Sequence, residues 1–300
     1  MSLDQAQGSR LAASTAEGAA AIRAAGAGER DATLRGPDDL AARFVRSGVR
    51  VTSLVKLPLL RRLAPALAER LLPGSYWFEL ARVKHMDEIL RDELAAGAQQ
   101  LVVLGAGLDT RAYRFARELA GVATFEVDHP VTAALKRERV VAVFGELPAH
   151  VRYVEADLNA GDLGHRLRAA GYRRELRTVV IWSGVAPYLE PPGVDAVLTW
   201  FAGAAPASTI VFDYVFREAV EGDTSFHGAA QLRRRLARGG EPLLFGITRG
   251  ATARFMGERG LRLVSDAGPE QLERRHLVRS DGRIAGRPYG FVAIAHARVP

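Results

Sequence analysis

Two glycines and one aspartate carry the strongest chemical signal in this sequence. Residues 101–104 are apolar and run directly into Gly105 and Gly107, and residues 123–128 form a second strand-like segment that ends on Asp128. A strand followed by a glycine turn lets backbone N–H groups approach a ligand closely. An acidic residue about twenty positions later can accept hydrogen bonds from ribose hydroxyls. The pattern therefore predicts a site for an adenosine-containing cofactor.

The residues of the turn favour S-adenosylmethionine over NAD as that cofactor. Thr110 stands where a dinucleotide-binding G-x-G-x-x-G turn has its third glycine, and Asp109 would put an anion beside a pyrophosphate. S-adenosylmethionine has no phosphate, and its methionine end carries an ammonium and a sulfonium. Acidic side chains around the turn are therefore compatible with it, while NAD is the alternative that the residues leave open.

The elements that position these residues alternate between strands and helices. Strands are predicted over residues 101–104, 123–128, 151–155, 178–183, 208–214, 261–265 and 290–298, with helices over 110–120, 131–145, 161–171, 191–205 and 248–259. Such alternation predicts a Rossmann-like α/β fold, a doubly wound and mostly parallel seven-stranded sheet. The last two strands are expected to close the sheet as an antiparallel pair.

The segment before the sheet is predicted to be a helical cap. Residues 1–98 hold an Ala-rich helix over 11–27, a helix start after Asp38 and a longer amphipathic helix over 75–96. Residues 99–300 would form the Rossmann-like core of a single domain spanning 1–300. An insertion near 217–247 is expected to act as a lid.

Composition excludes several classes of protein. The net charge of +7 comes from 41 basic residues of which only three are lysines, and they are scattered, so we expect no nucleic-acid partner. With no cysteine there are neither disulfides nor thiolate sites. The seven histidines lack local metal-motif spacing, so no metal site is predicted. Neither a signal peptide nor an apolar run of about 18 residues is present, which predicts a cytoplasmic protein with no membrane partner.

The glycine turn and its flanks resemble a known family. The run from Val103 to Phe115, VLGAGLDTRAYRF, is similar to the leucine carboxyl methyltransferase family, especially the bacterial branch that includes polyketide carboxyl O-methyltransferases. Further segments match in the same order, at residues 81–87, 125–130, 155–158, 182–189 and 260–268. The resemblance covers roughly residues 14–298 and implies a class I methyltransferase fold with S-adenosylmethionine as cofactor.

Roles for the glycine turn and the two acidic strand ends follow from this resemblance. It implies that Gly105, Ala106 and Gly107 pack against the methionine part of the cofactor, and that Asp128 holds the ribose. The aspartate of the pair that follows the third strand, Asp157-Leu158, would lie beside the adenine amino group.

Arg82 and Ser183 are the remaining cofactor residues that the resemblance implies. Arg82 corresponds to the arginine that pairs with the cofactor carboxylate, a role suited to a planar guanidinium. Ser183 stands where the protein-methylating branch has a glutamate that contacts the cofactor ammonium. That departure leaves cofactor binding in place but argues against the branch's substrate, a protein C-terminal leucine.

The expected activity is O-methylation of a carboxylate or hydroxyl on a natural-product-type small molecule or a peptide C-terminus. C- or N-methylation, an NAD-dependent oxidoreductase and a non-catalytic cofactor-binding module are the alternatives. A carboxylate acceptor is ionised at pH 7 and needs no general base, whereas a phenol would benefit from one. Candidates for a catalytic side chain are Tyr188, His85, His227 and His129.

Acceptor contacts are expected from residues 40–80 and 217–245, which hold aromatic and basic side chains: Phe44, Tyr76, Trp77, Phe226, Arg233 and Phe245. These aromatics could equally be ordinary core residues. Glu126, inside the second strand, is interpreted as solvated or ion-paired and not as a ligand. The run Arg233–Arg235 is interpreted as a solvated helix face.

Overall fold

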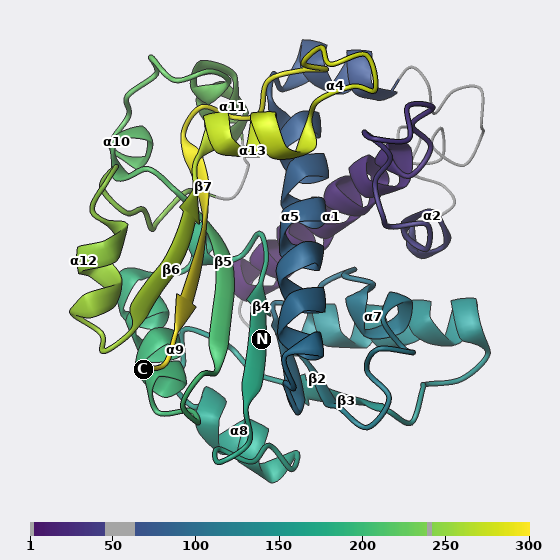
Figure 1. Ribbon diagram of the computed structural model, residues 1–300, viewed down its shortest axis with the longest axis vertical. Helices are drawn as coiled ribbons and strands as arrows, with labels where there is room; N and C mark the ends of the chain where they lie inside the picture. The colour runs from purple at the N-terminus through teal and green to yellow at the C-terminus, as the bar shows by residue number, and fades with distance from the viewer. Residues whose placement is uncertain (1–2, 46–63, 239–241) are drawn as a thin grey trace.

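A seven-stranded sheet forms the centre of the protein in the computed structural model, which describes residues 3–45, 64–238 and 242–300 (Figure 1). The strand order is β3-β2-β1-β4-β5-β7-β6, with β7 antiparallel to both of its neighbours. This is the predicted doubly wound sheet with an antiparallel closing pair. The strands are β1 Gln100–Leu104, β2 Ala123–Asp128, β3 Val151–Glu155, β4 Thr178–Trp182, β5 Thr209–Val215, β6 Arg262–Ala267 and β7 Val292–Arg298.

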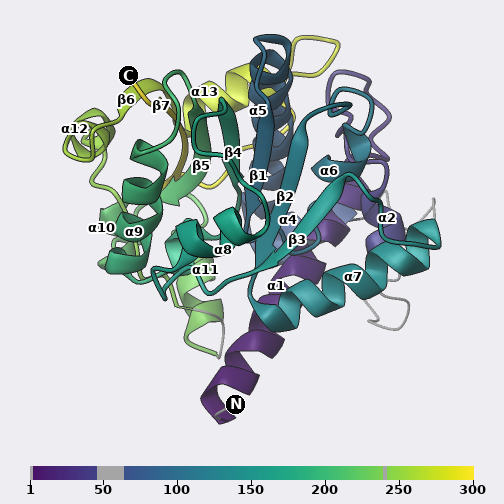
Figure 2. The same cartoon turned by 90° about the horizontal axis from the view of Figure 1, so that it is seen from below.

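Helices cover both faces of the sheet, and Figure 2 shows α5 and α13 on one side with α8 and α9 on the other. The helices before the sheet are α1 Leu3–Gly26, α2 Ala41–Phe44, α4 Ala64–Leu71 and α5 Ser75–Ala95. Those within and after the first strands are α6 Arg111–Arg114, α7 Pro130–Phe144, α8 Leu163–Ala169, the 3₁₀ turn Ala186–Tyr188 and α9 Pro191–Ala202. The last are α10 Arg217–Val220, α11 Ala229–Leu236, α12 Thr252–Gly257 and α13 Pro269–His276.

Three helical predictions differ from the structure. The helix expected over 110–120 is only the single turn α6, followed by turns as far as Gly121. The segment 217–260, which the sequence predicts to be helical with glycine interruptions, contains only the short helices α10, α11 and α12 within its described residues. Helix α13 was not predicted, although Pro269 at its first turn and a side-chain bond from Gln271 to the Gly268 N–H mark its start.

Helices α1, α2, α4 and α5 precede the sheet in the described part of the chain. Asp38 accepts a hydrogen bond from the Ala41 N–H at 3.0 Å just before α2, but the N-cap residue of this helix is Leu40 and not Asp38 or Asp39 as predicted. Pro58, Pro65 and Pro73 predict short helical pieces in the stretch that follows, of which α4 lies within the described residues and residues 46–63 lie outside them. Figure 1 shows α4, α11 and α13 above the upper end of the sheet, where the parallel strands finish.

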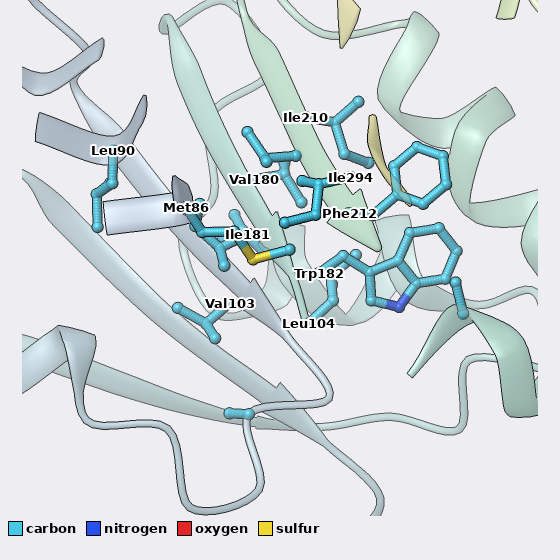
Figure 3. Packing of buried hydrophobic residues seen from close by; sticks show 14 of the residues in the cluster. Met86, Leu90, Val103, Leu104, Val180, Ile181, Trp182, Ile210, Phe212 and Ile294 are labelled. Atoms are coloured by element: carbon cyan, nitrogen blue, oxygen red, sulfur yellow. The ribbon is translucent and has the colours of Figure 1, made fainter. Parts of the chain in front are cut away.

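The core between α5 and the sheet is built from alternate strand residues. Val103 and Ile181 are register partners on β1 and β4, and they share a layer with Met86 and Leu90 of α5 (Figure 3). Trp182 stacks against Phe212 of β5 with ring centroids 5.5 Å apart. Since β1, β4 and β5 are buried along their whole length, they form the rigid platform from which the site residues project.

No helix among the described residues is long and apolar enough to cross a membrane.

Candidate functional site

The glycine turn after β1 adopts a backbone that only glycine accepts easily. Gly105 and Gly107 have φ angles of 59° and 43°. A Cβ atom built on Gly105 would lie 2.3 Å from Val185 Cγ2 in the loop after β4, and one on Gly107 would lie 3.5 Å from Ala16 of α1. The turn is therefore closely packed between the β4 loop and the N-terminal helix.

Asp128, at the end of β2, is bonded directly to this turn. Its Oδ2 accepts from the Gly107 N–H at 2.5 Å and its Oδ1 accepts from the His129 N–H at 2.7 Å. Burial raises the pKa of Asp128, while these two N–H donors oppose that shift by stabilising the carboxylate. The predicted pairing of the turn with an acid about twenty residues later is thus present in the structure.

Arg82 of α5 lies beside the loop after β4. It forms ion pairs with Glu79 and with Asp213 of β5, the second at 2.8 Å, and a Cβ on Gly184 would lie 2.8 Å from its Nη1. Asp213 also accepts from the Gly184 N–H at 2.6 Å. Burial on its own would lower the pKa of Arg82, but the Asp213 and Glu79 carboxylates raise it, so the guanidinium is a fixed cation.

One N–H donor of the Arg82 guanidinium has no hydrogen-bond acceptor among the described residues. This donor is the Nε atom, which is buried. A buried N–H without an acceptor costs free energy, so the position is suited to an anionic ligand atom.

Sequence reasoning missed both carboxylates that hold Arg82. Asp213 is the acid in the otherwise apolar strand TIVFDYV, and it is 4% exposed. An acidic residue in the middle of a fully buried strand is a signal that could have been used. Glu79 lies three residues before Arg82 on the same helix, which is the spacing of a helical ion pair.

A larger buried ion network surrounds the site and was also not predicted. Arg23 of α1 bonds to Asp38 at 2.8 Å and to Glu79 at 3.3 Å, and its Nη2 donates to the Leu108 carbonyl in the glycine turn at 2.6 Å. The remaining pairs are Arg111 with Asp87 and Asp109, and Arg114 with Asp87 and Asp38. The network joins the cap helices α1 and α5 to the glycine turn.

Asp157, Leu158 and Ser183 occupy the same edge of the sheet. Asp157 follows β3, is exposed and accepts from the Asn159 N–H at 2.9 Å, while Leu158 beside it is buried. Ser183 directly follows β4 and is half-buried next to Gly184. Because β4 and β5 pair through Trp182 and Phe212, the next residues along, Ser183 and Asp213, are neighbours.

Glu126 is outside the site, as interpreted from the sequence. It is buried in an ion pair with Lys136 at 2.9 Å and accepts from the Tyr113 hydroxyl at 2.8 Å.

The candidate catalytic residues fall in different places. Tyr188 ends the 3₁₀ turn after β4, is half-buried, and acts electrostatically on Arg82 and on Tyr289. His85 is instead hydrogen-bonded to His276 of α13, at 3.0 Å between ring nitrogens. His129 caps α7 and is part of no catalytic pair that the structure describes.

His227, a candidate catalytic residue, and Phe226, a predicted acceptor contact, both line a cavity of about 380 Å³. Arg249, Arg287, Glu270 and Glu273 give this cavity both signs of charge. The other expected acceptor aromatics are core residues: Phe44, Tyr76, Trp77 and Phe245 are all at most 7% exposed. Arg233 is exposed and donates to the Gly222 carbonyl, as a solvated helix face would.

Two further aromatic residues were missed near Arg82. The Arg82 guanidinium lies 5.3 Å from the ring centroid of Phe78, and that ring contacts Tyr289 at 6.1 Å. Tyr289 directly precedes Gly290 of the 380 Å³ cavity, so an aromatic path connects the arginine to the cavity wall.

Known proteins resemble this chain in sequence. The sequence profile described as leucine carboxyl methyltransferase matches residues 16–202. The chain is 27% identical over 194 residues to a Bacillus subtilis protein named "Putative S-adenosyl-L-methionine-dependent methyltransferase YktD", covering 64% of each chain. A Mycobacterium sp. (strain JLS) protein of the same description is 30% identical over 208 residues, covering 65% of each. The chain thus aligns with less than two thirds of the length of these relatives.

A solved structure shares the fold. It is a crystal structure titled as a putative methyltransferase from Thermobifida fusca, with a TM-score of 0.57 and 19% identity, covering 80% of this chain and 88% of that one.

Proposed function

This chain belongs to the leucine carboxyl methyltransferase family, and from that premise we propose that it binds S-adenosylmethionine and methylates an oxygen atom of a small-molecule or peptide acceptor, with a carboxylate as the first choice. The observation that carries the proposal is the convergence of the glycine turn, Asp128 and Arg82 at one edge of the sheet.

The residues present fit the two ends of the cofactor differently. At the methionine end, Arg82 offers a buried Nε–H with no partner among the described residues, and this donor suits the cofactor carboxylate. At the nucleoside end, the Asp128 carboxylate is held in place by two backbone N–H groups and keeps acceptor capacity for ribose hydroxyls. Asp157 and Leu158, on the adjoining strand end, are the proposed adenine contacts.

The ammonium of the cofactor would meet Ser183, which carries no charge. Asp213, its neighbour on β5, supplies a carboxylate to the same region. Asp213 is already bonded to Arg82 and to the Gly184 N–H, so it contributes electrostatically to an environment that tolerates a cation. This supports the view that the serine does not abolish cofactor binding.

Methyl transfer places modest demands on the protein. The cofactor supplies an activated methyl group; the acceptor oxygen–carbon bond forms as the sulfur–carbon bond breaks, and S-adenosylhomocysteine leaves. The residues of the chain then have to orient the acceptor and exclude water. The two carboxylates beside Arg82, Glu79 and Asp213, are both ion-paired with it, so neither is free to act as a general base. An acceptor that is already an anion fits such a site.

Tyr188 and Tyr289 are the proposed acceptor-side residues. Burial raises the pKa of Tyr289 well above its usual range, so its hydroxyl stays protonated and can donate to an anionic acceptor. His227, on the wall of the nearby cavity, has a lowered pKa because of burial and the Arg287 charge, and is neutral at pH 7. It is the residue to test if the acceptor is a hydroxyl that needs a base.

Calorimetric titration of the purified chain with S-adenosylmethionine, S-adenosylhomocysteine and NAD tests the cofactor part directly. We expect binding of the first two and none of NAD. Binding of NAD alone would overturn the proposal in favour of an oxidoreductase.

The acceptor part is tested by incubating the enzyme and S-adenosylmethionine with panels of matched carboxylic acids, phenols and amines, read by mass spectrometry. Products from the acids that revert on mild alkaline hydrolysis would be methyl esters. Methylation of amines only would favour N-methylation, and tight cofactor binding without turnover on any panel would favour a binding module.

A further inference from the structure

Two histidines from distant parts of the sequence meet between α5 and α13. His85 Nδ1 and His276 Nε2 are 3.0 Å apart, and the rings cross edge to face with centroids 5.2 Å apart. Both side chains are buried, at 6% and 2% exposed. Glu88 lies one turn after His85 on α5, with its Oε1 3.7 Å from His276 Nδ1. These three residues can each offer a ligand atom within 4.8 Å of the others.

We propose that His85, His276 and Glu88 bind a divalent transition-metal ion, Zn²⁺ above all, which fastens α13 to α5. This inference is separate from the proposed methyl transfer, and neither depends on the other. The identity of the metal follows from the ligands, because two imidazoles and a carboxylate are a common zinc donor set.

The spacing of the two histidine nitrogens that face each other fits this ion. Two nitrogens bound to zinc at 2.0–2.1 Å in tetrahedral geometry lie about 3.3 Å apart. The 3.0 Å between His85 and His276 therefore requires an opening of only a few tenths of an ångström. The Glu88 side chain is 39% exposed, so an ion held there would have a position open to water.

The protonation state of the pair also suits a metal. Burial lowers the pKa of His85 to about 4 and that of His276 to about 3, so both rings are neutral at pH 7 and carry a lone pair. As a simple hydrogen bond the pair is incomplete, because His85 Nε2 is buried with no hydrogen-bond partner among the described residues. Hydrogen bonding between the two histidines therefore leaves one buried ring nitrogen without a partner among the described residues.

The charged residues around the two histidines and Glu88 determine how tightly the site is expected to bind Zn²⁺. Arg275 holds Glu88 Oε2 at 3.0 Å, which leaves Oε1 for the ion, and Lys84 donates to the His276 carbonyl at 3.1 Å. His296 of β7 also lies near enough to His85 for its charged form to lower the pKa of that histidine. With two nearby cations and three ligands, we expect binding weaker than that of a four-ligand structural zinc site but specific for metals that prefer imidazole.

Metal-free full-length protein, without an affinity tag that contains histidines, is titrated with Zn²⁺ by calorimetry and with Co²⁺ by visible absorption. We expect one Zn²⁺ per chain and intense Co²⁺ bands that indicate tetrahedral nitrogen and oxygen ligation. Histidine ¹⁵N NMR spectra should show Zn²⁺ shifting His85 Nδ1 and His276 Nε2.

Three variants make the test specific. His276→Gln and Glu88→Gln should each weaken Zn²⁺ binding by about tenfold or more. His165→Ala removes an exposed histidine on α8 and is the matched control, expected to bind as the wild type does. Glu88 is partly exposed, so its variant keeps the proposal testable if the buried His276 variant does not fold. The proposal would be overturned if the wild type did not bind Zn²⁺. It would also be overturned if folded Glu88→Gln and His276→Gln proteins bound Zn²⁺ as tightly as the wild type does.

Discussion

Asp128 is the residue whose replacement tests the proposed site most directly, because it has two separable roles. Its carboxylate holds the glycine turn through the Gly107 and His129 N–H groups. In the proposed complex it also accepts from the ribose. Asp128→Ala removes all of these acceptors, whereas Asp128→Asn keeps one oxygen.

The two roles give two magnitudes. In Asp128→Ala, two part-buried N–H groups lose their charged acceptor. Each lost hydrogen bond costs about 1–2 kcal/mol, so the free energy of unfolding should fall by about 2–4 kcal/mol. Loss of the ribose bonds should weaken cofactor binding by about 1–3 kcal/mol, which is roughly fivefold to 150-fold in Kd. Asp128→Asn should lie between the wild type and Asp128→Ala in both quantities.

Urea unfolding measures the first quantity and calorimetric titration with S-adenosylhomocysteine the second. Asp281→Ala is the matched control, since Asp281 also accepts from a turn N–H, that of Arg283 at 2.9 Å, but lies on an exposed loop. It should lose some stability and no cofactor affinity. A folded Asp128→Ala protein that binds the cofactor as tightly as the wild type would refute the placement of the ribose at Asp128.

Three further perturbations test the packing and charge around the site. Gly105→Ala should lower cofactor affinity more than tenfold and reduce stability, because the new Cβ would lie 2.3 Å from a valine methyl. Gly97 also has a positive φ but open space around it, so Gly97→Ala should cost only about 1 kcal/mol of stability in the same unfolding assay. Lys136→Met should destabilise the fold by about 3–5 kcal/mol by leaving Glu126 buried and unpaired, and adding Glu126→Gln should restore most of the loss; equal stability of single and double variants would contradict this. Burial lowers the pKa of His296 to about 4, so the unfolded chain takes up its proton first as the pH falls below about 6.5. Stability should decline by about 1.4 kcal/mol per pH unit from this group down to pH 4, and the decline should be shallower in His296→Asn when followed by urea unfolding.

The sheet could be predicted from the sequence because its strands are simple patterns. β1, β4 and β5 are short runs buried on both faces, and each ends at a change of composition that marks a turn. The contact between the glycine turn and Asp128 could also be predicted, because the ends of two neighbouring parallel strands meet at one edge of the sheet. Helix α13 was not, because a polar eight-residue segment has no apolar period that distinguishes it from a loop.

The electrostatics of the site could not be read in the same way. Most basic residues are arginines, and beyond Arg82 and the run Arg233–Arg235 the sequence assigns no position to any of them. Arg23, Arg82, Arg111 and Arg114 are instead largely buried and paired with acids that lie up to 131 residues away. The pairings between distant residues are set by tertiary packing, so sequence spacing indicates only the local pair of Glu79 and Arg82. The same holds for His85 and His276, which are 191 residues apart.

The buried ion network also explains why the N-terminal cap belongs to the site and is not a mere cover. Arg23 of α1 bonds to the Leu108 carbonyl in the glycine turn and to Glu79, and Glu79 in turn bonds to Arg82. Removing one residue of a buried ion pair leaves the other residue charged, buried and unpaired. This costs more free energy than the intact pair contributes to stability. The position of Arg82 at the cofactor edge therefore depends on α1 being docked. A chain lacking α1 would lose both the Arg23 bond to the glycine turn and the fixed orientation of the Arg82 guanidinium.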